Sequence, residues 1–179
     1  MFGTILTGSA TEASRFNPSS PYAATKAAAE LLINSYFVTH GLDVVITRCT
    51  NNYGPHQFAE KLIPKTIGLC KQDGKIPIYG SGRSIRDWIH VKDHCEAIML
   101  VLEKGKPGES YNISASNELD NITIVKNILT LLKKPEDRLQ FGKQRPGEDL
   151  RYSLDSSKIR KELDWKPKIS FDVGLEETI

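Results

Sequence analysis

The sequence predicts an α/β fold, namely part of a doubly wound parallel sheet together with a smaller mixed α/β lobe. The first observation is a Pro- and Gly-free helical stretch over residues 22–40, followed after two residues by an apolar, β-branched run over 42–48. Such a run is typical of a strand that is covered on both faces. A helix followed directly by such a strand is typical of a doubly wound α/β sheet. The second observation is that the rest of the chain alternates short strand patterns with helical ones.

Composition excludes several classes of protein. The chain has 179 residues, of which 39% are hydrophobic and 26% charged, so a single globular domain with a small lobe is expected. The formal net charge of +2 gives no basic surplus, and we expect no nucleic-acid partner. No apolar run approaches the roughly 20 residues of a membrane span, and the first residues are not expected to be a signal peptide. Three cysteines without CxxC spacing indicate reduced thiols and a cytoplasmic protein.

The N-terminal part is expected to be a loop over the first twenty residues, then one long helix. Ala residues favour that helix, and Leu31, Leu32, Tyr36 and Phe37 are expected to supply its buried stripe. Gly41 is expected to end it. We place a soft boundary near residue 48, between two parts that pack as one unit.

The second part is predicted to mix helices and strands. Asn51–Phe58 is expected to be a polar loop, and Asn121 or Thr123 is expected to cap a helix that ends near Leu132. The run Asp155-Ser156-Ser157 is expected to cap a helix that ends before Trp165, and Ser170 is expected to cap the last helix. The other predicted elements are helices over 61–72 and 92–103 and extended segments over 76–79, 84–90 and 110–113.

The residues with the clearest chemical meaning are Tyr22 and Lys26. They are four residues apart on the predicted helix and therefore share one face. A cation fixed beside a phenol favours the phenolate, which can accept a proton from a sugar hydroxyl. On its own the YxxxK spacing is more often incidental, so this interpretation depends on the motifs that follow. His90 and His94 offer too few ligands for a metal, and no metal site is expected.

An ordered set of motifs follows the YxxxK pair: RCTNNYGP (48–55), EKLIP (60–64), PIYG (77–80), RDWIHV (86–91), YNI (111–113) and RPGED (145–149). From Gly3 onward, this set resembles the extended short-chain dehydrogenase/reductases, and among them the dTDP-glucose 4,6-dehydratases. The resemblance implies a Rossmann-type fold and a lyase of deoxysugar biosynthesis. Such an enzyme uses bound NAD to convert a nucleotide-activated glucose to its 4-keto-6-deoxy product.

The resemblance also implies a role for each matching residue. Tyr22 would be the redox base, Lys26 would support its phenolate and bind the nicotinamide ribose, and Asn52 would lie near the nicotinamide. The substrate, dTDP-glucose or UDP-glucose, would be bound by Asn51, Lys61, Leu62, Pro77, Ile78, Tyr79, Arg86, Asn121 and Arg145. Arg is suited to a diphosphate because its guanidinium is a bidentate fork, although a surface pair of Arg86 with Asp87 or another carboxylate is the alternative.

Two features of the family are missing from the 179 residues: a Gly-rich turn for the pyrophosphate of NAD, and the acidic pair that serves the elimination. We therefore expect the chain to correspond to the C-terminal part of such an enzyme and to be inactive alone. Residues 1–48 would be the remnant of the NAD-binding domain, and residues 49–179 mainly the nucleotide-sugar lobe. Glu148 also departs from the bacterial enzymes, which have His there.

Two alternatives remain open. A nucleotide-sugar 4-epimerase uses the same Tyr/Lys redox step without elimination, and a truncated, non-catalytic module would bind the nucleotide sugar only. The resemblance further implies a homodimer formed through the Tyr/Lys helix.

Overall fold

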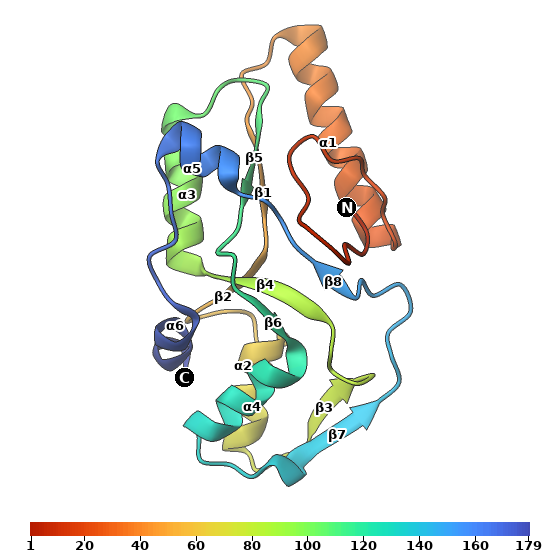
Figure 1. Cartoon of the computed structure of the whole chain (residues 1–179), viewed down its shortest axis with the longest axis vertical. Helices are drawn as coiled ribbons and strands as arrows, with labels where there is room; N and C mark the ends of the chain where they lie inside the picture. Colours follow the sequence, from red (N-terminus) through yellow and green to blue (C-terminus); the bar gives the residue numbers. More distant parts are fainter.

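A computed structural model describes the whole chain, residues 1–179 (Figure 1). The helices are α1 (Pro21–His40), α2 (Leu62–Lys71), α3 (Val91–Lys104), α4 (Asn121–Leu131), α5 (Ser157–Leu163) and α6 (Phe171–Thr178), with a 3-10 turn at Glu136–Arg138. The strands are β1 (Ile46–Cys49), β2 (Asn51–Tyr53), β3 (Ile76–Tyr79), β4 (Ile85–His90), β5 (Ser110–Ile113), β6 (Glu118–Asp120), β7 (Leu139–Gly142) and β8 (Arg151–Tyr152). No helix is long and apolar enough to cross a membrane.

The sheets are mainly parallel, and the predicted α/β class is confirmed. β1 pairs with β5, β2 pairs with β4 and β3 pairs with β7, each in parallel. β4 is the central strand of the four-stranded sheet, because it also pairs with two further strands. It pairs with β6 in antiparallel register and with β8 in parallel register. In Figure 1 the β1–β5 pair lies between α1 and the helices α3 and α5, while α2 and α4 lie at the opposite end near β3 and β7.

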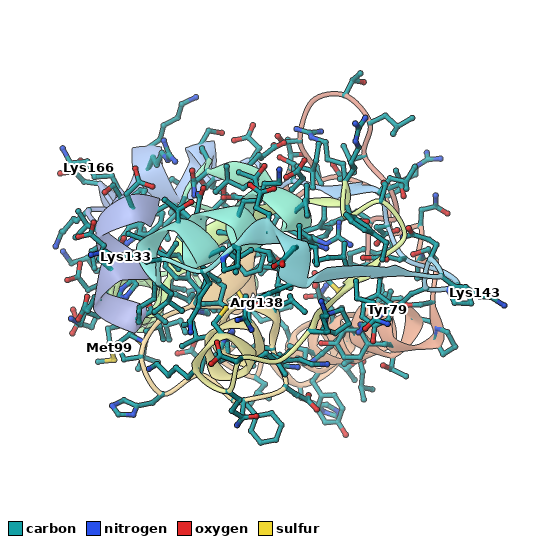
Figure 2. All side chains as sticks on the ribbon, turned by 90° about the horizontal axis from the view of Figure 1, so that it is seen from below. Tyr79, Met99, Lys133, Arg138, Lys143 and Lys166 are labelled. Carbon is teal, nitrogen blue, oxygen red and sulfur yellow. The ribbon has the colours of Figure 1, made fainter.

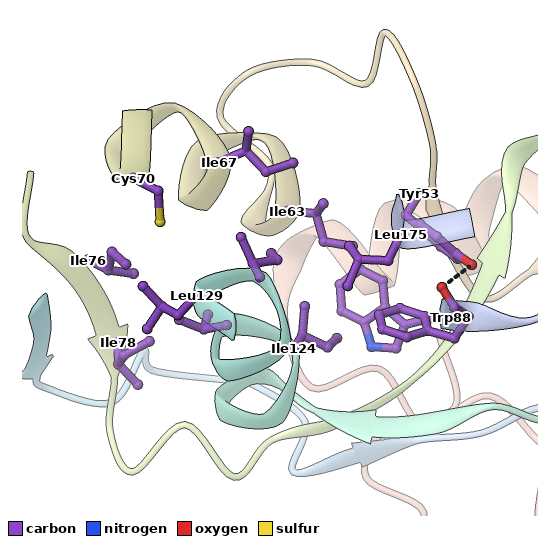
Figure 3. Packing of buried hydrophobic residues seen from close by; sticks show 13 residues of the cluster. Tyr53, Ile63, Ile67, Cys70, Ile76, Ile78, Trp88, Ile124, Leu129 and Leu175 are labelled. Carbon is purple, nitrogen blue, oxygen red and sulfur yellow. Dashed lines mark hydrogen bonds between the residues drawn. The ribbon is translucent and has the colours of Figure 1, made fainter. Parts of the chain in front are cut away.

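The two larger of three hydrophobic clusters hold these parts together. The larger one fills the space among α2, α4, α6 and the strands β3 and β4, and Figure 3 shows Ile63, Ile124 and Leu175 packed around Trp88 and Tyr53. The smaller cluster packs α3 and α5 against β1 and β5, with Tyr111 and Ile113 completely buried. β4 contributes to both clusters, with Trp88 in the larger one and Ile89 in the smaller one.

The long helix begins and ends as predicted, but its buried face differs. The Ser20 side chain accepts a hydrogen bond from the backbone N–H of Ala23, and Gly41 ends the helix at φ 63°. The expected apolar stripe was wrong, because Leu31 and Leu32 are each 59% exposed. The buried residues are instead two alanines and one glutamate: Ala23, Ala27 and Glu30.

Two local predictions in the second part were also wrong. Residues 51–53, expected to be loop, form β2 because their backbone pairs with β4. The cap of α4 is Asp120, whose carboxylate accepts from the N–H of Thr123, and neither Asn121 nor Thr123 has that role. Asp and Asn are equally good N-cap residues, so residue type does not distinguish Asp120 from Asn121. The residue at which the first helical turn begins decides which of them is the cap.

Candidate functional site

A cavity of about 1090 Å³ lies where the N-terminus of α1, the start of α2, the strands β3 and β4, and the connection between β7 and β8 meet. It contains eleven of the twelve side chains that the sequence predicted for the site. They are Tyr22, Asn51, Asn52, Lys61, Leu62, Pro77, Ile78, Tyr79, Arg86, Asn121 and Arg145. These residues come from segments up to 123 positions apart, between residues 22 and 145, so the fold assembles them.

Lys26 is the one predicted residue that does not line this cavity. It lies one helical turn beyond Tyr22, with its Nζ 5.9 Å from the centre of the Tyr22 ring. Both side chains are exposed, and Tyr22 is 72% exposed. The same ammonium acts on Cys49: burial raises the pKa of that thiol, and the charge of Lys26 partly opposes the rise.

A buried ion pair fixes α1 against β1. The Arg48 Nε lies 3.0 Å from each carboxylate oxygen of Glu30, and an Arg48 terminal nitrogen also binds that carboxylate. Arg48 donates further to the backbone oxygen of Glu12 at 3.1 Å and lies over the ring of Phe2. Because Glu30 is one turn beyond Lys26 and two beyond Tyr22, this pair sets the rotation of the helix that carries them.

Asn52 and Gln57 present unpaired acceptors at the cavity wall. The Gln57 amide donates to the backbone oxygen of Asn52 at 2.7 Å, and the Asn52 amide donates to Cys49 Sγ at 3.4 Å. The carbonyl oxygens of both side-chain amides are buried without a partner. A buried, unpaired acceptor costs about 1–3 kcal/mol, so a ligand that brings an N–H donor there is favoured.

Cations supply the positive charge of the cavity. Arg145 stacks on Tyr79, with its Cζ 3.8 Å from the ring centre, and its hydrogen bonding and charge lower the pKa of that phenol. Lys61 is exposed and pairs with Glu60 at 3.2 Å. Figure 2 shows Tyr79 at the same end of the molecule as Lys143, which belongs to the connection that also carries Arg145.

Arg86 is paired, but not with its sequence neighbour. Asp87 is buried and accepts hydrogen bonds from the backbone N–H of Asn117 at 2.8 Å and of Ser116 at 3.3 Å, so it serves the β5–β6 connection. The Arg86 Nη2 lies 3.5 Å from a carboxylate oxygen of Glu148, inside the cavity rather than on the outer surface. Burial lowers the pKa of Arg86, and the charge of Glu148 opposes this.

Eight lining residues were not among the predicted site residues, although Glu148 had been noted as a departure from the bacterial enzymes: Ser20, Gln57, Glu60, Lys65, Trp88, Pro146, Gly147 and Glu148. Two of them carried a usable signal. Lys65 is four residues after Lys61 and thus on the same helical face, and Trp88 is two residues after Arg86 and thus on the same strand face. No cluster of three or more His, Cys, Asp or Glu side chains that could hold a metal is present.

Comparison with known proteins places the chain in a family. The family model described as GDP-mannose 4,6 dehydratase matches residues 1–178. The chain belongs to this family. A dTDP-glucose 4,6-dehydratase of Actinoplanes sp. is 46% identical over the whole chain, and one of Haemophilus influenzae is 49% identical over 94% of it. The chain spans about half the length of these relatives, 56% and 53% respectively.

Solved structures of similar proteins share the fold closely. A dTDP-glucose 4,6-dehydratase of Streptomyces venezuelae, solved with NAD bound, matches with a TM-score of 0.97 and 46% identity over 99% of this chain and 55% of that one. A UDP-glucuronic acid 4-epimerase of Bacillus cereus matches with a TM-score of 0.93 and 28% identity, over 98% of this chain and 56% of that one. The fold is therefore of the Rossmann type, and the epimerase is the more distant of these two.

Proposed function

We propose that this chain provides the Tyr/Lys helix and the nucleotide-sugar cavity of an NAD-dependent dehydratase that acts on dTDP-glucose. The observation that carries the proposal is the cavity itself, which holds the Tyr22 phenol together with Lys61, Lys65, Arg86 and Arg145. A sugar joined to a nucleoside through two phosphates needs such a combination: cations for the diphosphate and a proton acceptor for the sugar. The names of the relatives at 46% and 49% identity support dTDP-glucose over other nucleotide sugars.

Each part of the cavity has a distinct task in this proposal. Tyr22 accepts the proton of a sugar hydroxyl, and Lys26 stabilises the resulting phenolate from one turn away. Arg86 and Arg145 hold the diphosphate, and the apolar Pro77 and Ile78 lie along the base. Residues 1–48 thus carry the redox base and residues 49–179 most of the substrate contacts.

Bound NAD would supply the hydride acceptor for oxidation of the sugar carbon, while Tyr22 would take the proton of its hydroxyl. Asn52 and Gln57 would offer their unpaired oxygens to its amide, and Lys26 would bind its ribose. The 179 residues contain no Gly-rich turn for the pyrophosphate. We therefore propose that the isolated chain binds the nucleotide sugar without turning it over.

Calorimetry with dTDP-glucose, combined with mass spectrometry of the mixture after incubation with NAD, tests the proposal. The expected result is saturable binding of dTDP-glucose and no 4-keto product from the purified chain. Absence of binding contradicts the assignment of the cavity. Conversion of UDP-glucose to its 4-epimer would favour the epimerase function over the dehydratase function. Formation of the 4-keto product would contradict the proposal that the isolated chain is inactive.

We also propose that α1 forms a contact between two copies of the chain. Its outer face carries Leu31, Leu32, Tyr36 and Val38, which are 49–82% exposed. An apolar face of this kind is favoured at an interface. Sedimentation equilibrium of the wild type and of Leu31→Ser/Leu32→Ser tests this: a dimer that becomes monomeric supports the contact, and a monomeric wild type contradicts it.

A further inference from the structure

The Arg86 guanidinium, which the proposed function assigns to the diphosphate, already has an anionic partner within the same chain. Its Nη2 lies 3.5 Å from Glu148 Oε1, and both side chains are largely withdrawn from solvent, at 15% and 16% exposure. Because both groups line the cavity, this pair occupies the surface on which a phosphate would be held. Carboxylate and phosphate use the same donor edge of an Arg fork, so they compete for it.

The two partners differ in how firmly they are held. Arg86 lies on β4, which is paired on both sides, and its Nη1 donates to the backbone oxygen of Ile85 at 2.7 Å. Glu148 lies in the connection between β7 and β8, outside any helix or strand. When the pair separates, the Glu148 carboxylate is therefore the group that moves, and the Arg86 guanidinium stays in place.

The chain also offers the displaced carboxylate a second partner. The Gln144 amide donates to Glu148 Oε2 at 2.6 Å, on the oxygen that does not face Arg86. The next residue, Asp149, accepts from Ser19 Oγ at 2.7 Å, which fastens the connection beside the start of α1. Glu148 can thus leave Arg86 and keep one hydrogen bond, while the backbone of its loop stays anchored.

We infer that Glu148 is an internal competitor of the cavity: it occupies the Arg86 fork when no ligand is present and competes with any incoming diphosphate. This inference rests on the proposed function. Its consequence is that each anion must displace an internal carboxylate, so a small anion with few other contacts binds weakly. A nucleotide sugar overcomes the competition because its base and sugar add contacts along the rest of the cavity.

The test is calorimetric titration of the wild type and Glu148→Gln with three probes: inorganic pyrophosphate, dTDP and UDP. Gln keeps the size of the side chain and can retain a hydrogen bond with Gln144, but it removes the competing charge. The expected result is that Glu148→Gln binds all three probes about five- to tenfold more tightly, the scale of one partly exposed charge pair. Glu176→Gln, an exposed change of identical charge on α6, is the matched control and should leave all three affinities unchanged.

The remaining outcomes contradict the inference. If the wild type binds the probes and Glu148→Gln binds them with the same affinity, Glu148 does not compete with the ligand. That result leaves the proposed function intact. Weaker binding of UDP with unchanged binding of dTDP would make Glu148 a contact of the ribose hydroxyls instead. Failure of both proteins to bind any probe would overturn the proposed function and the competition together.

Discussion

Glu30 of α1 and Arg48 of β1 form an ion pair whose side chains are only 5% and 6% exposed. The pair joins the helix that carries Tyr22 and Lys26 to the parallel β1–β5 pair. Apart from two alanines, Glu30 is the only buried residue of that helix, so the position of the helix depends strongly on this contact.

Removal of one partner should therefore be costly. Glu30→Ala leaves the Arg48 guanidinium buried without its carboxylate, which is expected to lower the free energy of unfolding by about 3–5 kcal/mol. Urea unfolding followed by circular dichroism measures it. The double variant Glu30→Leu/Arg48→Met should recover much of the loss, since it leaves no unpaired charge. A loss below about 1 kcal/mol in the single variant would show that the pair does not hold the helix.

Arg145 is expected to contribute directly to diphosphate binding. Arg145→Ala removes a charge-assisted hydrogen bond of about 1.5–3 kcal/mol, which corresponds to roughly 10- to 100-fold weaker binding of dTDP. Lys143→Ala, on the same connection but outside the cavity lining, is the matched control and should change the affinity little. Equal effects of the two substitutions in calorimetry would reduce Arg145 to a general surface charge.

The tyrosines are expected to ionise in a defined order. The Arg145 guanidinium lowers the pKa of Tyr79, whereas burial raises the pKa of Tyr152 to about 12 and raises that of Tyr53 further. Of these three phenols Tyr79 should ionise first, so ultraviolet difference titration of Tyr79→Phe should lose an early phenolate signal. In Arg145→Gln that signal should shift to higher pH. An unchanged early signal in either variant would contradict the stacked arrangement.

Stability is expected to fall on mild acidification. Burial lowers the pKa values of His90 and His94 in the folded chain, so the unfolded chain binds protons first as pH decreases. The stabilisation from neutral histidine is present above the unfolded pKa of about 6.5 and is lost as pH falls through the lower folded values. Melting temperatures measured across this window should decline, and His90→Gln should decline less steeply than the wild type. A melting temperature that rises toward pH 5 would contradict the sign.

Sequence patterns were sufficient for the features that depend on neighbours in the chain. Ser20 and Gly41 at the ends of α1 act through hydrogen bonds to residues three or four positions away, so local composition predicts them. The apolar residues of α1 form a periodic stripe, but periodicity does not say which face meets a partner. The buried face is instead the one that carries Glu30, and its partner Arg48 is 18 residues away.

The remaining differences come from long-range pairing. β2, β6 and β8 have two or three residues each, too few for a periodic signal, and all three lie in the ladders around β4. The pairing of Arg86 with Glu148 spans 62 residues and depends on how the β7–β8 connection passes β4. The residue types of the cavity were predictable from motifs and resemblance, whereas their pairing required the three-dimensional structure.

The central claim is that one cavity joins the Tyr22 phenol to the cations that grip a nucleoside diphosphate. Backbone amide chemical shifts of the isotope-labelled chain, followed during titration with dTDP-glucose, test it most directly. The predicted result is a saturable shift of the amides of Tyr22, Asn52, Tyr79, Arg86 and Arg145, with no change on the distant α3 face around Met99. Shifts confined to other surfaces, or shifts of the arginine segments without Tyr22, would contradict the claim.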